Sequence, residues 1–537
     1  MVRKEIGSIF DRINRNNMND NFEYLFEGSN RIDALSSHAE NILNEANRIN
    51  EENISTQKQI DNLILSKGQS DAEVIQARGN SPLLKDRLNN MESDTKKNEN
   101  AMKYRDFARL GVIKYPDDFD RVLPFNLYVD EYGKVQHDFN FDTLHNQSNA
   151  TVYWDWVNGT TGMDGTDPGF PTKRFNKVME TVSNMSSDTV TIEVMNRLVP
   201  YTELGGKFSS TLNKNVIIKP HESIDRSIIT TARDTTTFNW TKDGNSYYAT
   251  RSAVVEVIDA KFKDFRGNPM SYRKVNTLSQ NKNTPGSYYI YNSDQVYIHT
   301  YDGRKPDADV GMILPIGYEI HFIIDSNFLF LDNISYVFAS TTGNALKVSG
   351  IESSKFYARN SIFAYGETNG LGTSRVGEVY TFNCQAFGNG SDGFNYHGTN
   401  GESPYEFVFE YYDYAHENGH KVGGTGNATT AHDGMTILRV GSIGHDCNGP
   451  ILADVNGCYS LNYNCTMFDS VRPNGRTRAG FYFDDVGKQR TDSKYYLINC
   501  GGGGIETMTV NTDGRADLVI QNLEGNNIPS DLVYSLL

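Results

Sequence analysis

The chain has little of several residue types, and each shortage narrows the class of protein. Its 537 residues include five cysteines, an odd number with no Cys-x-x-Cys pair, which argues against a disulfide framework. No apolar run approaches the roughly 18 residues of a membrane-spanning helix, so we expect no membrane insertion. Basic residues number 51 against 67 acidic ones, and the net charge of −16 disfavours nucleic acid as a partner.

The composition of the first residues also bears on targeting. Residues Met1 to Asp20 are polar and contain no apolar core segment, so we expect no signal peptide and folding in a cytoplasm. What the chain does contain is tyrosine and phenylalanine, 31 and 28 residues, together with 47 glycines. That composition favours β structure with exposed contact faces.

The first hundred residues carry a heptad pattern from Ile32 onward. Its a positions are Ile32, Ala39, Ala46, Asn53 and Ile60, and its d positions are Leu35, Ile42, Ile49, Thr56 and Leu63. A repeat of this kind predicts a coiled-coil stem within residues 1–103, with Asn53 setting register and strand number. A solvated surface helix is the alternative. Residues 104–156 read as a connector of short strands and proline-led turns.

From residue 157 to 525 the pattern is that of a solenoid. A glycine- and aspartate-rich turn leads into a short amphipathic helix, Thr172 to Val182, which we expect to cover the open end of a β stack. Between Tyr380 and Ile505, short strand-like runs return at a variable period of roughly 16–35 residues, as in stacked β coils. The turns between them are alike: Asn383-Cys384, Asn418-Gly419, Asn448-Gly449, Asn464-Cys465 and Asn499-Cys500. An insertion of alternating strands interrupts the coils at about 228–312, and 526–537 is a tail.

Acidic and histidine residues gather between 390 and 446. If successive coils stack in register, residues one period apart lie on one face, about 4.8 Å apart per coil. The pairs Asp392/His397, His416/Glu417 and His432/Asp433 are therefore expected to converge on one groove. Paired carboxylates there can act as general acid and base on a glycosidic bond. Histidines beside carboxylates can instead hold a divalent cation that activates water, and the residues do not identify a metal.

Two sets of candidate site residues follow from this cluster. The candidate catalytic residues are Asp392, His397, Glu417, His432 and Asp433. The candidate substrate-binding residues are Phe394, Tyr396, His416, His445 and Asp446, since aromatic faces beside acidic groups suit carbohydrate. The alternative is that these are turn residues and solubilising loop residues, because Asp-Gly and Asn-Gly suit tight turns.

Several segments resemble known families. "GMDGTDPGFPTKRFNKVMETV", followed by β coils, resembles the head of pectate-lyase-like right-handed parallel β-helix proteins. "DGFNYH", "HENG", "NATTAHDG" and "GPILADV" together resemble the β-helix spikes and appendages of tailed bacteriophages of Gram-positive hosts. "SDAEVIQARGNSPLLKDRLNNME" is similar to the virion-attachment region of phage minor structural proteins.

The resemblance implies a mainly β protein, a right-handed β-helix on an N-terminal coiled-coil stem, that forms a homotrimer. It implies a virion protein, made in the host cytoplasm and attached through its N-terminus to other tail, baseplate or neck proteins. It further implies a tail spike that recognises and degrades a host cell-wall glycopolymer such as teichoic acid or exopolysaccharide. The alternatives are a receptor-binding spike without turnover and a purely structural virion component.

Overall fold

The computed structural model describes residues 115–525 except 117–118, 120, 122, 131–133, 201–207, 231–232, 252–253, 255, 264–268, 314–317, 338–341, 400–405, 420–425, 471–477, 488–489, 491, 512–516 and 522. The coiled-coil stem expected within residues 1–103 and the tail 526–537 lie outside the described residues. Among the residues that the structure describes, no helix is long and apolar enough to cross a membrane.

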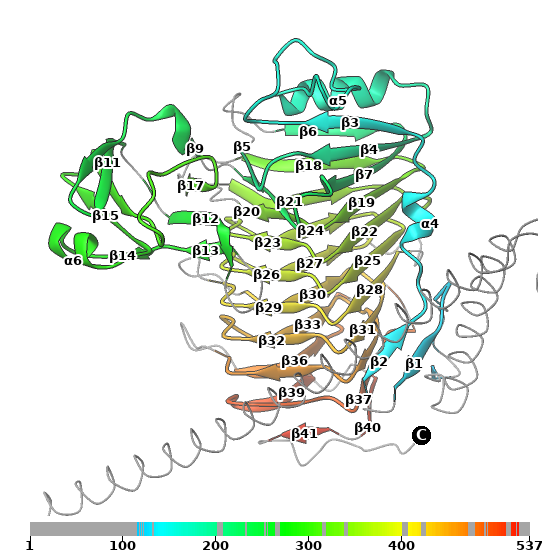
Figure 1. Cartoon of the computed structure of the whole chain (residues 1–537). Coiled ribbons are helices and arrows are strands. Elements are labelled where there is room, and N and C mark those ends of the chain that lie inside the picture. Colours follow the sequence, from blue (N-terminus) through cyan, green and yellow to red (C-terminus); the bar gives the residue numbers. More distant parts are fainter. Residues whose placement is uncertain are drawn as a thin grey trace, which may run out of the picture. The chain divides into compact units, whose positions relative to one another are not determined.

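Three parallel sheets dominate the described part of the chain (Figure 1). Sheet I consists of β3 (Ala150–Trp154), β4 (Thr189–Val194), β7 (Asn215–Pro220), β19 (Phe328–Asp332), β22 (Lys355–Arg359), β25 (Glu378–Phe382), β28 (Phe407–Tyr411), β31 (Thr436–Val440), β34 (Tyr459–Tyr463), β37 (Lys494–Ile498) and β40 (Leu518–Gln521). Sheet II consists of β5 (Leu198–Pro200), β8 (Ser227–Thr230), β20 (Ile334–Val337), β23 (Ile362–Ala364), β26 (Gln385–Phe387), β29 (Tyr414–His416), β32 (Ile443–His445), β35 (Thr466–Phe468), β38 (Gly501–Gly503) and β41 (Glu524–Gly525). Sheet III consists of β6 (Phe208–Leu212), β18 (Tyr318–Ile324), β21 (Thr342–Ser349), β24 (Leu371–Ser374), β27 (Phe394–His397), β30 (Thr429–His432), β33 (Leu452–Val455), β36 (Ala479–Asp484) and β39 (Thr507–Asn511).

From β4 onward the chain visits these sheets in a fixed order, from I to II to III, and the strands of each sheet pair in parallel from one coil to the next. The coil length varies: the paired Lys355 and Glu378 are 23 residues apart, whereas the paired Tyr459 and Lys494 are 35 residues apart. This is a parallel β-helix with coils of unequal length, as the irregular period predicts. Its first strand in sheet I, β3, precedes residue 157, the boundary expected from the sequence.

The corner between sheets I and II explains the recurring asparagines. One residue there has a positive φ in successive coils: Asn333, Asn360, Asn383, Tyr412, Gly441, Asn464 and Asn499. Asparagine tolerates this left-handed conformation better than most residues. In three coils the next residue is a cysteine, and Cys384, Cys465 and Cys500 are all buried. The other two predicted turn pairs, Asn418-Gly419 and Asn448-Gly449, lie in the loops from sheet II to sheet III.

We expect Asn464→Val to destabilise the β-helix, because a β-branched residue at φ 54° is strained by about 1–2 kcal/mol. The matched control is Asn464→Gly, which adopts this φ without steric strain. Thermal unfolding followed by circular dichroism measures the difference. Equal melting temperatures for the two variants would show that the corner conformation does not limit stability.

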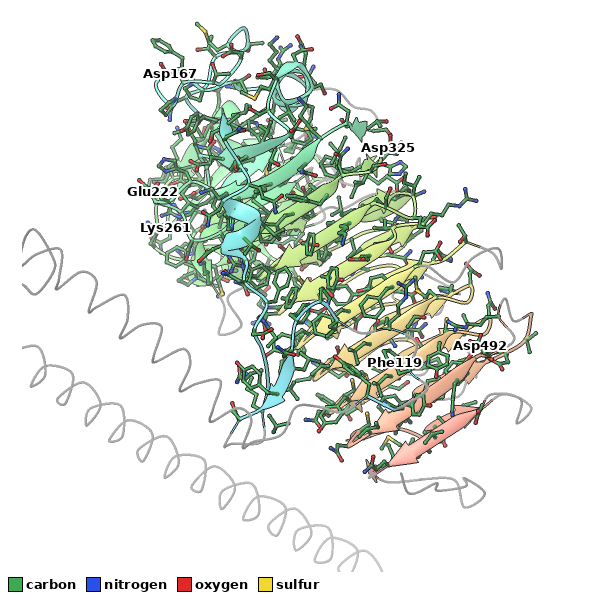
Figure 2. All side chains as sticks on the ribbon, turned by 90° about the vertical axis from the view of Figure 1, so that its right-hand side faces the viewer. Phe119, Asp167, Glu222, Lys261, Asp325 and Asp492 are labelled. Carbon is green, nitrogen blue, oxygen red and sulfur yellow. The ribbon has the colours of Figure 1, made fainter. Side chains whose placement is uncertain are left out.

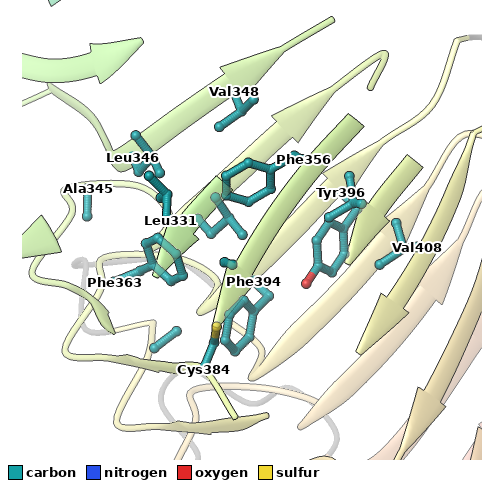
Figure 3. Packing of buried hydrophobic residues seen from close by; sticks show 14 of the residues in the cluster. Leu331, Ala345, Leu346, Val348, Phe356, Phe363, Cys384, Phe394, Tyr396 and Val408 are labelled. Atoms are coloured by element: carbon teal, nitrogen blue, oxygen red, sulfur yellow. The ribbon is translucent and has the colours of Figure 1, made fainter. Parts of the chain in front are cut away.

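The core fills the space between the three sheets with inward-pointing side chains. Figure 3 shows part of it, where Leu346, Phe356 and Phe394 from three sheet strands pack together with Cys384. At the N-terminal end, α5 (Phe175–Asn184) packs Phe175 against Trp154 with ring centroids 4.6 Å apart. The buried face of α5 belongs to the same core, so the helix covers the end of the stack as expected from the sequence.

The outer face of sheet I is also apolar, and the segment before the β-helix covers it (Figure 2). This segment holds β1 (Leu127–Val129), β2 (Val135–His137) and α4 (Asp142–His145). Phe125 contacts Phe409 edge-on at 5.3 Å, and Phe139 stacks on Phe382 at 5.4 Å. Burial on both faces explains why the strands of sheet I read as continuous hydrophobic runs.

An insertion between β8 and β18 forms two smaller sheets beside sheet II (Figure 1). Its elements are β9 (Arg233–Asp234), η1 (Thr235–Thr237), β10 (Thr241–Asp243), β11 (Ser246–Thr250), β12 (Glu256–Lys263), β13 (Pro269–Ser271), β14 (Arg273–Lys274), α6 (Leu278–Asn283), β15 (Ser287–Tyr291), β16 (Gln295–His299) and β17 (Val310–Ile313). Ile258 and Ala260 of the insertion pack with Leu198, Ile228 and Val337 of sheet II. The insertion is therefore anchored to the β-helix by an apolar contact.

Candidate functional site

A groove of about 710 Å³ runs over the outer face of sheet III, across β27, β30, β33 and β36. Its volume lies within the usual range for ligand sites. The groove is lined by Thr368, Asn369, Ser391, Asp392, Asn395, His397, Asn427, Thr430, His432, Pro450, Ala453, Val455 and Tyr482. Three of the five candidate catalytic residues, Asp392, His397 and His432, are among them.

The alternation of a β-strand decides which side chains reach this groove. In β27, Asn395 and His397 point outward, whereas Phe394 and Tyr396 point into the core. The next coil is in register, so His397 lies beside His432 and Asn395 lies beside Thr430. Stacking of the coils therefore brings residues that are 35 positions apart next to each other. The sequence analysis predicts this for His397 and His432.

Asp392 lines the groove and is almost fully buried. Its Oδ1 accepts the backbone N–H of Asn427 at 2.9 Å, and its Oδ2 accepts a side-chain N–H of Asn395 at 2.5 Å. Burial raises the pKa of Asp392 above the usual carboxyl range, and the hydrogen bonds offset this only in part. A carboxyl with a raised pKa can keep its proton and donate it.

Next to Asp392 and Asn395, His397 and Asp433 form a hydrogen-bonded pair of side chains. The two side chains meet at 3.0 Å between Nδ1 of His397 and Oδ2 of Asp433, while Asn456 donates to Oδ1 of Asp433 at 3.0 Å. The hydrogen bond from His397 lowers the pKa of Asp433, whereas burial raises the pKa of Asp392. With Nδ1 donating to Asp433, Nε2 of His397 is free to accept a proton.

His432 links the two pairs. Its ring stacks on that of His397 with centroids 4.3 Å apart, and its Nε2 accepts from Nδ2 of Asn395 at 3.3 Å. Burial, helped by the neighbouring His397, lowers the pKa of His432 to about 4, so this ring is neutral at neutral pH. Asp392, Asn395, His432, His397 and Asp433 thus form one chain of contacts along the groove.

Two of the predicted substrate-binding residues are not available to a ligand. Phe394 and Tyr396 are 1% and 0% exposed and belong to the hydrophobic core, so the expectation that they stack on sugar rings is wrong. The cause is the two-residue period of the strand. His397 faces out, and residues an odd number of positions away in β27 face in.

The remaining predicted residues lie on sheet II and not in the groove. His416 stacks on His445 at 5.3 Å, and each ring bonds to the carboxylate that follows it. His416 Nδ1 is 3.1 Å from Glu417, and His445 Nδ1 is 2.7 Å from Asp446. Glu417 and Asp446 have positive φ at the corner that leaves sheet II. The expectation that Glu417 shares a groove with Asp392 is wrong, because the two residues belong to different faces of the β-helix.

Sequence reasoning missed several groove residues. Asn395 and Thr430 are outward neighbours of the predicted histidines, and the strand period points to both. Tyr482 of β36 lines the groove from two coils after His432, and nothing in the local sequence marks it. Within the described part of the chain, no group of three or more His, Cys, Asp or Glu side chains is arranged to hold a metal ion.

The raised pKa of Asp392 predicts how its replacement changes stability with pH. A group whose folded-state pKa is raised contributes most below its unfolded pKa, and this contribution is lost as pH rises through the folded pKa. We therefore expect Asp392→Asn to gain stability relative to the wild type as the pH rises from below the usual carboxyl range to neutral, because the wild type must ionise a buried carboxyl over this range. Melting temperatures across this pH range test it, and a constant difference would contradict it.

Comparisons with known proteins find weak structural similarities to this chain. No protein-family model and no curated protein matches it. A solved glycoside hydrolase is 8% identical over 71% of this chain and 97% of its own, with a TM-score of 0.40. A pectate lyase is 12% identical over 71% and 80%, with a TM-score of 0.33. The ORF18 protein of Geobacillus virus E2 is 8% identical over 78% and 67%, with a TM-score of 0.29. These scores are too low to carry an argument about the reaction.

Proposed function

We propose that the chain is a phage tail spike or appendage that recognises and cleaves a glycopolymer of the host cell surface, with the sheet III groove as its active site. The observation that carries the enzymatic part is the chain of contacts that joins Asp392, a buried carboxyl whose pKa is raised, to His397, an imidazole held by Asp433. Cleavage of a glycosidic bond by general acid and base needs this division of roles.

In the proposed reaction, Asp392 donates its proton to the glycosidic oxygen while the bond from that oxygen to the sugar carbon breaks. Water attacks the same carbon and gives up a proton to Nε2 of His397. Asp433 positions the imidazole through its bond to Nδ1. One bond to oxygen is thus exchanged for another, and water supplies both the new hydroxyl and the proton that His397 takes up.

Digestion of purified host polymers tests this function. We expect the full-length protein to release shorter fragments, and Asp392→Asn to release none. Glu417→Gln is the matched control, because this carboxylate lies on sheet II, and it is expected to keep full activity. Tight binding by the wild type with unchanged polymer length would reject the enzymatic part and leave a receptor-binding spike.

The virion role rests on the heptads and on the segments that resemble phage proteins. The proposed partners are two further copies of this chain, other tail, baseplate or neck proteins at the N-terminus, and the host glycopolymer. We expect light scattering to find a single species of three times 60.3 kDa. A monomer at micromolar concentration would contradict the trimer and leave the groove chemistry untouched.

A further inference from the structure

The groove over sheet III has a direction, because its lining comes from successive coils. One wall is formed by residues that precede β24, β27, β30 and β33: Thr368, Asn369, Ser391, Asp392, Asn427 and Pro450. Together with Tyr482 of β36, the lining spans five neighbouring strands of sheet III. Four steps of about 4.8 Å make the groove about 19 Å long along the axis of the β-helix. More than one sugar ring of a polymer therefore fits along it.

The floor of the groove is a row of outward-facing residues in register. Asn395 of β27 pairs with Thr430 of β30. Thr430 in turn pairs with Ala453 of β33, which pairs with Tyr482 of β36. Tyr482 thus lies three coils, or about 14 Å, from Asn395, whose side chain contacts Asp392. The short side chain of Ala453 leaves the floor low between the Asp392 end of this row and Tyr482.

Among the described residues that line the groove, Tyr482 has the largest side chain and the only phenol ring. The residue is half-buried. Its Oη donates to Oδ2 of Asp484 at 3.3 Å, two positions later on the same strand. This bond holds the hydroxyl end of the ring in place. An aromatic ring that lines a groove in this way suits the C–H face of a sugar ring.

We propose that Tyr482 forms a sugar-binding subsite that sets how the length of the substrate affects cleavage. The proposal rests on the proposed function and adds a substrate contact to the same groove. Asp392 precedes the second of the five strands and Tyr482 lies on the fifth, so the groove is longer on one side of the cleaved bond. A polymer reaches Tyr482 only if it is long enough to cross β30 and β33, and longer substrates are therefore favoured.

Cleavage of oligosaccharides of graded length tests the subsite. They are prepared by partial hydrolysis of the teichoic acid and of the exopolysaccharide of a Gram-positive host. For the wild type we expect kcat/KM to rise with chain length until the substrate reaches Tyr482. In Tyr482→Ala, KM for long oligosaccharides is expected to rise about three- to tenfold with little change in kcat. The advantage of long chains over short ones is expected to disappear.

Three further variants separate the ring from the fold. Tyr482→Phe keeps the ring and is expected to keep the advantage of long chains. Tyr482→Leu keeps apolar volume without the ring, and it is expected to lose this advantage even where Tyr482→Ala does not fold. Tyr291→Ala removes an exposed tyrosine of the insertion and is the matched control, with unchanged length dependence.

Each outcome decides the subsite separately from the reaction. Cleavage by the wild type, with the same length dependence in Tyr482→Leu, would overturn the subsite and keep the proposed function. If the wild type binds a polymer without cleaving it, the enzymatic part fails and binding decides the inference. Weaker binding by Tyr482→Leu than by Tyr291→Ala would then support the subsite, and equal binding would overturn it. A wild type that binds neither polymer would reject both.

Discussion

Replacing Asp433 with asparagine is expected to lower kcat for polymer cleavage by about 10²–10⁴-fold. His397 then loses the carboxylate that positions its ring and stabilises the imidazolium formed when the ring takes up a proton. The melting temperature is expected to stay close to that of the wild type. Asp433 is at a corner with φ 63°, which asparagine adopts readily, and an amide oxygen can still accept from Asn456. Initial rates on host polymer and thermal unfolding measure the two effects.

The loss of kcat in Asp433→Asn is not expected to add to the loss of kcat caused by removing the imidazole of His397. The double variant of Asp433→Asn with His397→Ala should be no slower than His397→Ala alone, because the carboxylate acts through the ring. A double variant slower than His397→Ala by the full factor of Asp433→Asn would give Asp433 a role of its own. A variant that keeps its rate but melts many degrees lower would make the pair structural.

The second large effect concerns the interior of the β-helix. Arg439 has no exposed surface, and it forms a bidentate pair with Asp454 at 2.9 and 3.0 Å and reaches Glu410 at 3.3 Å. Arg439→Met is expected to destabilise the fold by about 3–5 kcal/mol, because two buried carboxylates lose their cation. The protein should melt many degrees lower or fail to accumulate in folded form.

Removing the carboxylates together with the arginine provides the control. In the triple variant Arg439→Met, Glu410→Gln, Asp454→Asn, no unpaired charge remains, so much of the stability is expected to return. If the triple variant is as unstable as Arg439→Met, lost packing and not lost charge explains the effect. Burial and the charge of Glu410 also raise the pKa of Asp413, the neighbouring carboxyl.

The sequence contains enough to predict the architecture of the β-helix. The Asn-Cys pairs are informative because the left-handed corner after each strand of sheet I favours asparagine, and the small cysteine after it fills an inner corner. Convergence of His397 and His432 is predictable for the same reason, since equal turns keep the coils in register. The loops between coils vary in length without disturbing this register.

Other features could not be predicted, for physical reasons. The direction of a side chain depends on the phase of the two-residue period: His397 points outward, and the adjacent Tyr396 is buried. Assignment of His416 and His445 to sheet II depends on where each coil turns its corner. The cover of sheet I by β1, β2 and α4 joins residues that are hundreds of positions apart, as when Tyr411 donates to the carbonyl of Val135.

The burial of Asp392 also changes an expectation drawn from the sequence. As a residue of an extruded turn, Asp392 would contribute little to folding. In the structure it is 8% exposed and ties β27 to the segment before β30 through the backbone N–H of Asn427. Its replacement therefore changes stability in a pH-dependent way, whereas replacement of Asp433 does not involve a buried proton.

The central claim is that the sheet III groove holds the scissile bond. A crystal structure of Asp433→Asn with a bound oligosaccharide of the host polymer tests it most directly. The account predicts a sugar chain across β27 and β30, with a glycosidic oxygen within hydrogen-bond distance of the Asp392 carboxyl. An oligosaccharide bound instead along the His416–His445 stack of sheet II, with the groove empty, would contradict the account.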